Sequence, residues 1–156
     1  MKSIIRLALC LLLCLGLGFL GGRLTRPEIA TWYASLAKPW WTPPEWVFGV
    51  VWPTLYASMG VSLWLLWEAR QAPDRGLAVA LFMAQLALNA TWTPIFFTWH
   101  QPVAALLVVA GLTLVLGATV GAAWRVRRLA AWLLAPYLIW TMYATALNAA
   151  IVALNP

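Results

Sequence analysis

The stretch PVAALLVVAGLTLVLGATVGAAW, residues Pro102–Trp124, decides the fold because it contains no charged residue along its whole length. A helix that crosses the roughly 30 Å hydrocarbon core of a bilayer needs about 20 consecutive apolar residues. This stretch supplies them. Strands of a membrane barrel would instead alternate apolar and polar residues over about ten positions. The stretch therefore predicts a transmembrane helix.

Four further apolar runs accompany this one along the chain. Together they predict five transmembrane helices at about 3–22, 46–67, 77–97, 102–124 and 129–154. The short connections leave no soluble domain within residues 1–156, which we interpret as a single transmembrane domain. Hydrophobic residues make up 64% of the chain, too many for a dissolved monomer to cover with polar surface. We expect an all-α integral membrane protein, a bundle of five transmembrane helices with a Trp/Pro-rich loop after the first.

The first apolar run also imitates a secretory signal. Lys2 and Arg6 precede the apolar residues 7–20, and Gly21-Gly22 follows them. This is the order of regions in a signal peptide. The local pattern alone leaves both a cleaved signal and a first transmembrane helix open.

The positive charges, with a formal net charge of +6, stand at the ends of the apolar runs. With five spans, one side of the membrane collects Lys2, Arg6, Arg70, Arg75, Arg125, Arg127 and Arg128. The other side collects Arg23, Arg26 and Lys38. The positive-inside rule then predicts a cytoplasmic N-terminus in an inner-type membrane, and residence in an inner or an outer membrane stays open. Because the charges are scattered rather than clustered on one face, no nucleic-acid partner is expected.

Residues that could support enzymatic chemistry are few. His100 is the only histidine, so neither a metal cluster nor a His-based triad can form. Cys10 and Cys14, four apart in an apolar run, are interpreted as apolar filler. The four acidic residues all lie in connections or at span ends, leaving no carboxylate for an intramembrane proton relay: Glu28, Glu45, Glu68 and Asp74. We expect no metal, no cofactor and no catalytic residue from these patterns.

Two predicted helices each carry a face of aromatic and amide side chains. Helical spacing places on one face of the third run Gln85, Asn89, Trp92 and Phe96. The fifth run places together Trp140, Tyr143, Ala144, Leu147 and Asn148. An amide in hydrocarbon is costly without a partner, so Gln85, Asn89 and Asn148 should face the interior. Either the amides join helices and the aromatics fill the core, or the two faces oppose each other across a ligand pocket.

The connection between the first two runs, TWYASLAKPWWTPPEW at residues 31–46, is rich in tryptophan and proline. Prolines limit its conformational freedom, and its aromatic rings suit the membrane interface. It is either an aromatic belt or a lid over the open end of the bundle. As a lid, it would bring Lys38 and Arg26 within reach of a ligand carboxylate.

Four motifs follow one another at fixed intervals: WYxxLxKPxWxPP at 32–44, WxFxxVWxxLYxxMG at 46–60, LNxxWxxIFF at 88–97 and PYLxWxxYATxLN at 136–148. In order and spacing they resemble the TspO/MBR family, which comprises the tryptophan-rich sensory proteins of bacteria and the translocator protein, or peripheral benzodiazepine receptor. The resemblance implies five transmembrane helices, the first of them retained, and a homodimer. It also implies binding of tetrapyrroles such as protoporphyrin IX. Eukaryotic members in addition bind cholesterol and synthetic benzodiazepine or isoquinoline-carboxamide drugs.

The resemblance also implies a ligand site among the helices beneath the first loop. Its residues, carried over motif by motif, are Tyr33, Trp46, Phe48, Trp52, Asn89, Trp92, Phe96, Trp140, Tyr143, Ala144, Leu147 and Asn148. One departure concerns sterols. Animal members follow the Leu-Asn pair with Tyr and Arg, whereas residues 149–156 here contain neither, which puts sterol recognition by that pattern in doubt. The composition looks bacterial, and we expect a bacterial member of the family.

The resulting hypothesis is a membrane receptor for porphyrins, in which the tetrapyrrole stacks on Trp52, Trp92 and Trp140. Membrane lipid is expected to surround the protein. One alternative is light- or oxygen-dependent degradation of the bound porphyrin, for which Trp52 and Trp140 would be the electron donors. Another is facilitated passage of a lipid or sterol. The sequence does not separate transport, sensing and degradation.

Overall fold

The computed structural model describes residues 2–156, which fold into five long helices and two π-helical turns. The elements are α1 (Lys2–Glu28), η1 (Ile29–Tyr33), α2 (Glu45–Glu68), α3 (Arg75–Thr93), η2 (Pro94–Thr98), α4 (Pro102–Val126) and α5 (Arg128–Leu154). Five helical spans, two of them the continuous pairs α1–η1 and α3–η2, are long and apolar enough to cross a membrane. The prediction of an all-α membrane bundle is confirmed.

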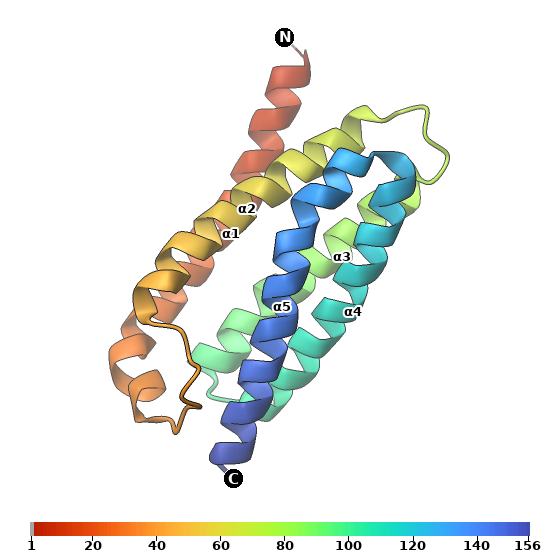
Figure 1. Cartoon of the computed structure of the whole chain (residues 1–156). Helices are drawn as coiled ribbons and strands as arrows, with labels where there is room; N and C mark the ends of the chain where they lie inside the picture. Colours follow the sequence, from red (N-terminus) through yellow and green to blue (C-terminus); the bar gives the residue numbers. More distant parts are fainter. Residues whose placement is uncertain (1) are drawn as a thin grey trace.

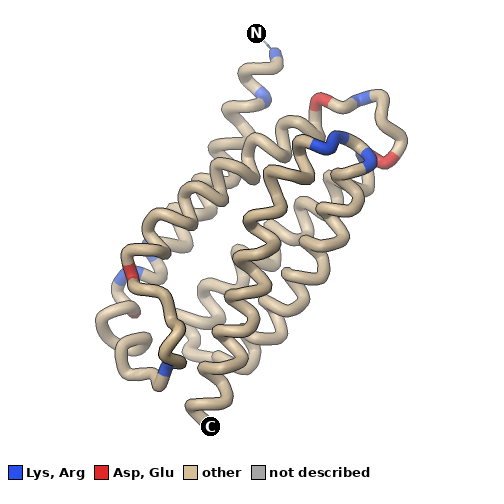
Figure 2. Tube along the Cα trace, viewed as in Figure 1, with Lys and Arg blue, Asp and Glu red and all other residues tan. Residues whose placement is uncertain are grey.

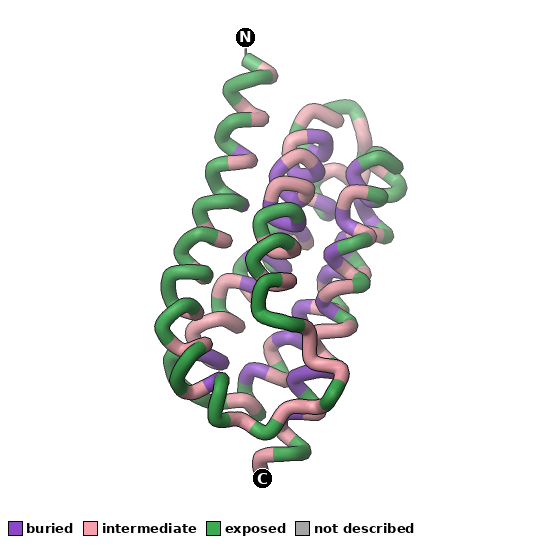
Figure 3. The backbone as a smooth tube through the Cα atoms, turned by 60° about the vertical axis from the view of Figure 1, so that its left-hand side comes forward, coloured by how far each residue is buried: buried purple, intermediate pink, exposed green. Residues whose placement is uncertain are grey.

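The helices run up and down, and the two termini lie at opposite ends of the bundle (Figure 1). Helices α3, α4 and α5 pack side by side, and α2 packs on α5. Helix α1 packs chiefly on α2 and is exposed along most of its length (Figure 3). Within α1 only Cys10 and Cys14 are buried, and both are free thiols in the main core cluster.

Two glycines let α1 approach α2 closely. A methyl group at Gly60 of α2 would lie 3.0 Å from Leu11 Cα and 3.2 Å from the Cys10 carbonyl oxygen, both backbone atoms of α1. On the other side of the contact, Gly18 of α1 lies directly against the ring of Tyr56. Backbone and ring therefore occupy space that side chains would fill at ordinary helix contacts.

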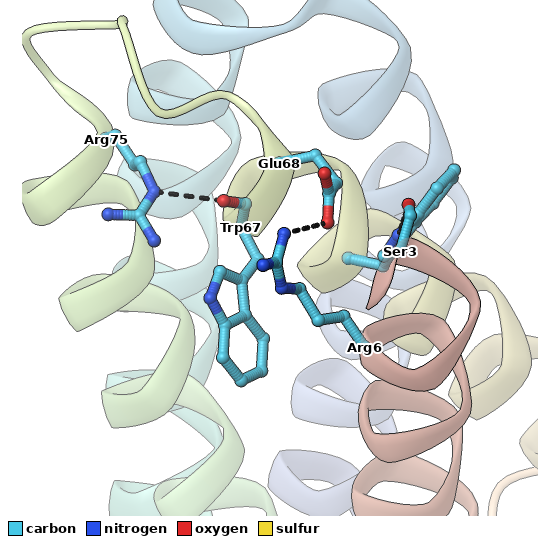
Figure 4. Close-up of polar contacts among 6 residues, drawn as sticks. Ser3, Arg6, Trp67, Glu68 and Arg75 are labelled. Carbon is cyan, nitrogen blue, oxygen red and sulfur yellow. Dashed lines mark hydrogen bonds and ion pairs between the residues drawn. The ribbon is translucent and has the colours of Figure 1, made fainter. Parts of the chain in front are cut away.

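Charged residues gather at the two ends of the bundle and leave its middle free of them (Figure 2). At the end that holds the N-terminus, Arg6 Nη1 donates a hydrogen bond to Glu68 Oε1 at 2.8 Å. Nearby, Arg75 Nε donates to the Trp67 carbonyl oxygen at 3.3 Å (Figure 4). These contacts fasten the beginnings of α1 and α3 to the end of α2.

The apolar run predicted that the first helix ends near Gly22, but the helix is longer. It continues to Glu28 and then widens into η1, with Pro27 inside the helix. The apolar run marks only the part within hydrocarbon, because helical hydrogen bonds do not depend on apolar side chains. Thr31 Oγ1 donates to the Pro27 carbonyl oxygen at 3.1 Å, which supplies a bond where the π-helical turn begins.

Replacing Gly60 with alanine should lower the free energy of unfolding by about 1–3 kcal/mol, because the methyl group meets the α1 backbone and one helix must move. Gly117→Ala is the matched control, since a Cβ there meets no atom within 4 Å. It should be neutral or stabilising by up to about 1 kcal/mol, because alanine favours helix more than glycine does. Thermal unfolding in detergent, followed by circular dichroism, measures both. Equal shifts in the two variants would contradict the close contact.

Candidate functional site

A cavity of about 640 Å³ lies between the helices on the side of the bundle that carries the α1–α2 loop (residues 34–44). Its lining comes from α1, η1, α2, α3, η2 and α5 and is mostly apolar. Ligand pockets usually measure about 300–1,000 Å³ and combine an apolar lining with a few polar groups. The cavity therefore has the size and character of a site for a small organic ligand.

One side of the cavity is a stripe of α1 that sequence reasoning missed except for Arg26. Leu15, Gly18, Gly22 and Arg26 recur at helical spacing and all line the cavity. A Cβ at Gly22 would meet no atom within 4 Å, so the cavity is open at this point. The stripe carries neither amide nor tryptophan, and the signal that could have found it is the recurrence of glycine within a leucine-rich run.

The opposite side is an aromatic wall, defined as Phe48 and Trp52 of α2 with Trp140 and Tyr143 of α5. The ring centroids of Trp52 and Trp140 are 6.3 Å apart with the planes at 85°, and Phe48 meets Trp140 edge to face at 5.8 Å. Trp140 and Tyr143 centroids are 5.8 Å apart. Such edge contacts hold each ring in place. The Trp140 Nε1 atom is buried and has no hydrogen-bond partner among residues 2–156.

A second group of rings closes the cavity where α3 passes into η2. Trp92 and Phe96 stack at 5.2 Å with planes 19° apart, and Phe97 meets Phe96 edge to face at 4.9 Å. Tyr33 of η1 packs on Phe97 at 5.8 Å and is buried. These rings join the end of the first span to the end of the third.

The interior amides serve the contacts between helices. Asn148 of α5 accepts a hydrogen bond from Trp92 Nε1 at 3.2 Å and donates to the Pro102 carbonyl oxygen at 2.9 Å, so it joins α3, α4 and α5. Asn89 of α3 accepts a hydrogen bond from the Tyr56 hydroxyl and donates to that of Tyr137. As predicted, these amides are buried.

Gln85, the third amide expected in the interior, is completely buried. It does not line the cavity, and neither its oxygen nor its nitrogen has a hydrogen-bond partner in the described part of the chain.

Ten of the predicted site residues line the cavity: Tyr33, Phe48, Trp52, Trp92, Phe96, Trp140, Tyr143, Ala144, Leu147 and Asn148. Two do not. Trp46 is 70% exposed, because in a helix it lies on nearly the opposite face from Phe48, two residues later. Asn89 is held by the two phenols away from the cavity lining. Besides the α1 stripe, the lining residues that were not among the predicted site residues include Arg23, Glu45 and Phe97.

The side chain of Lys38, in the α1–α2 loop, donates hydrogen bonds to nearby backbone carbonyl groups. Lys38 Nζ donates to the carbonyl oxygens of Tyr33 at 2.6 Å and Leu36 at 3.0 Å, where it caps the end of the first helical span. Of the two cations expected to meet a ligand carboxylate, Arg26 lines the cavity and Lys38 does not. In this arrangement carbonyl groups of its own loop occupy the Lys38 ammonium group.

The loop is also fastened to α5 and to the residue after it. Asn155 pairs twice with the backbone of Ala37, accepting from its N–H at 3.0 Å and donating to its carbonyl oxygen at 2.9 Å. The Tyr143 hydroxyl donates to the Trp41 carbonyl oxygen at 2.8 Å. The loop is thus tethered across the end of the bundle, and its Trp40 side chain is 95% exposed.

Comparisons with known proteins agree with the motifs. Residues 10–154 match the sequence model of the TspO/MBR family. The tryptophan-rich protein TspO of Chlorobaculum tepidum is 41% identical over 157 aligned positions, which cover 99% of each chain. The translocator protein of Homo sapiens is 43% identical over 135 positions, 83% of this chain and 78% of its own length. The tryptophan-rich sensory protein of Cereibacter sphaeroides is 40% identical, covering 86% and 82%.

Removing the Tyr137 hydroxyl should separate stability from ligand binding. Tyr137→Phe leaves the Asn89 amide short of one buried partner, which should cost about 1–3 kcal/mol of unfolding free energy. Tyr137 does not line the cavity, so the affinity for any cavity ligand should stay within about twofold of wild type. Thermal unfolding and ligand titration on the same preparation test both statements. A large loss of affinity without loss of stability would contradict this division.

Proposed function

The chain belongs to the TspO/MBR family of integral membrane proteins, and on that premise we propose that it binds protoporphyrin IX or a related tetrapyrrole in the cavity. The observation that carries the proposal is the aromatic wall: Phe48, Trp52, Trp140 and Tyr143 present ring surface to one apolar hollow. A flat aromatic ligand gains both burial of its apolar faces and stacking or edge contacts from such rings. The role is that of a membrane receptor or translocator for tetrapyrroles.

The same geometry favours passive handling of the ligand over ion-coupled pumping. Coupled transport needs ionisable side chains within the membrane that change charge during the cycle. The acidic residues lie at helix ends or in connections, and the cavity lining includes one of them, Glu45, in the first turn of α2. Binding would therefore buffer, sense or release the tetrapyrrole without a coupled ion.

A second candidate is degradation of the bound porphyrin in light and oxygen. Trp52 and Trp140 are oxidisable indoles 6.3 Å apart in the wall that would touch the ligand. Porphyrins absorb visible light, and dioxygen would be the oxidant. Illuminated samples would lose the porphyrin absorption spectrum in wild type and keep it in a Trp52→Phe/Trp140→Phe variant that still binds.

Alanine at Trp52 or Trp140 should weaken binding of protoporphyrin IX about tenfold, because each change removes stacking surface worth about 1–2 kcal/mol. Trp124→Ala is the control, since Trp124 does not line the cavity and packs on Trp132 at the surface. Saturable quenching of the remaining tryptophan fluorescence in detergent measures the affinity. Equal losses in all three variants would indicate unfolding, and unsaturable quenching in wild type would indicate partitioning into detergent.

Filling the cavity from α1 tests the site from its other side. Gly22→Leu should project into the hollow and reduce binding of protoporphyrin IX about tenfold or more, through steric exclusion. Gly117→Leu is matched: both glycines lie in transmembrane helices where an added Cβ would meet no atom within 4 Å, and only Gly22 lines the cavity. Because leucine favours helix over glycine, neither variant should lose stability. Unchanged binding in Gly22→Leu would place the ligand elsewhere.

A further inference from the structure

We propose that Arg23 and Arg26 of α1 bind the carboxylates of the tetrapyrrole held in the cavity. This inference rests on the proposed function, since it assigns the polar edge of the same ligand. Both arginines line the cavity, whose lining is otherwise mostly apolar. They lie three residues apart and so share one side of the helix.

Neither arginine side chain takes part in an ion pair in the described part of the chain. Within residues 2–156, Arg6 pairs with Glu68 and the Glu28 carboxylate contacts the His100 ring, and neither Arg23 nor Arg26 lies within ion-pair distance of a carboxylate. The Arg23 guanidinium carbon lies 5.7 Å from the ring centroid of Phe19, which is itself a lining residue. That contact holds the Arg23 head group at the edge of the cavity.

Of the two acidic residues near this edge, Glu45 lines the cavity and Glu28 does not. Glu28, two residues after Arg26, faces His100 with Oε2 and Nε2 3.0 Å apart. The His100 ring also stacks on Trp32, with the ring centroids 4.3 Å apart. Lys38 is engaged by carbonyl groups. Two guanidinium groups therefore face one lining carboxylate, that of Glu45, with which neither forms an ion pair.

The ligand that matches this arrangement has a flat apolar body and two anionic groups on one edge. Guanidinium groups bind carboxylates through paired, charge-assisted hydrogen bonds, and Arg23 and Arg26 are exposed and so free to form them. The two propionates of protoporphyrin IX project from the same edge of the macrocycle. With its rings against the aromatic wall, that edge can turn toward α1, where the two arginines stand one helical turn apart.

The test compares protoporphyrin IX with its dimethyl ester, which has the same macrocycle and no carboxylate charge. Both are titrated by tryptophan quenching against wild type, the Arg23→Gln/Arg26→Gln variant and an Arg125→Gln/Arg127→Gln variant. The last makes the same change in net charge at residues that do not line the cavity. A further variant, Arg23→Lys/Arg26→Lys, keeps the charge and removes the planar fork.

Wild type should bind the diacid about tenfold more tightly than the diester, the ratio expected for charge-assisted hydrogen bonds. Arg23→Gln/Arg26→Gln should lower the affinity for the diacid to that for the diester and leave the diester unchanged. The lysine variant should keep part of the preference, and the Arg125→Gln/Arg127→Gln variant should keep all of it. Thermal unfolding measures whether each variant is folded. If the glutamine variant does not fold, the change in diacid preference of the lysine variant tests the inference.

Three outcomes overturn the inference. If the preference for the diacid survives in both Arg23/Arg26 variants, or if both ligands weaken equally, the arginines only anchor α1 at the interface, while saturable binding leaves the proposed function standing. If wild type binds diacid and diester equally, carboxylates are not recognised. If wild type binds neither porphyrin saturably, the proposed function fails and the inference fails with it.

Discussion

The close approach of α1 to α2 is the constraint on which the rest of the structure depends. Gly60 lets the backbone of α1 lie against α2, and Gly18 makes room for the ring of Tyr56. Helix α1 also contacts α3 and η2, and it closes the bundle on one side. The space left over is the cavity, bounded by the α1 stripe and by the aromatic wall.

Polar and aromatic side chains divide the interior between them. An unsatisfied amide is costly in hydrocarbon, so Asn89 and Asn148 take part in hydrogen bonds that cross between helices. These bonds position α3 and α5 next to the cavity, and they leave most of its surface to rings such as those of Trp52 and Trp140. A rigid frame of buried hydrogen bonds thus supports a surface that offers mainly dispersion and stacking.

Apolar runs were enough to predict the bundle, because a bilayer requires spans of a minimum length, and the motifs indicated most of the cavity lining. What they could not indicate depends on the path of the backbone. The first helix outlasts its apolar run, since hydrogen bonds rather than side chains sustain it. Trp46 belongs to the same motif as Phe48 and points elsewhere, and Lys38 turns back onto carbonyls of its own loop. Gly22 contributes space to the cavity because it has no side chain, and a motif of reactive or polar residues does not indicate such a position.

The double pairing of Asn155 with Ala37 has a mechanical consequence. It joins the α1–α2 loop to the end of the helix that supplies Trp140 and Tyr143. The hydrogen bond from the Tyr143 hydroxyl to the Trp41 carbonyl oxygen adds a second connection. Three hydrogen bonds therefore join the loop to α5 and to Asn155, so a displacement of one should carry the other with it. Of the spans that line the cavity, the first has the smallest buried share, so its close contact with α2 at Gly18 and Gly60 is what holds it in place.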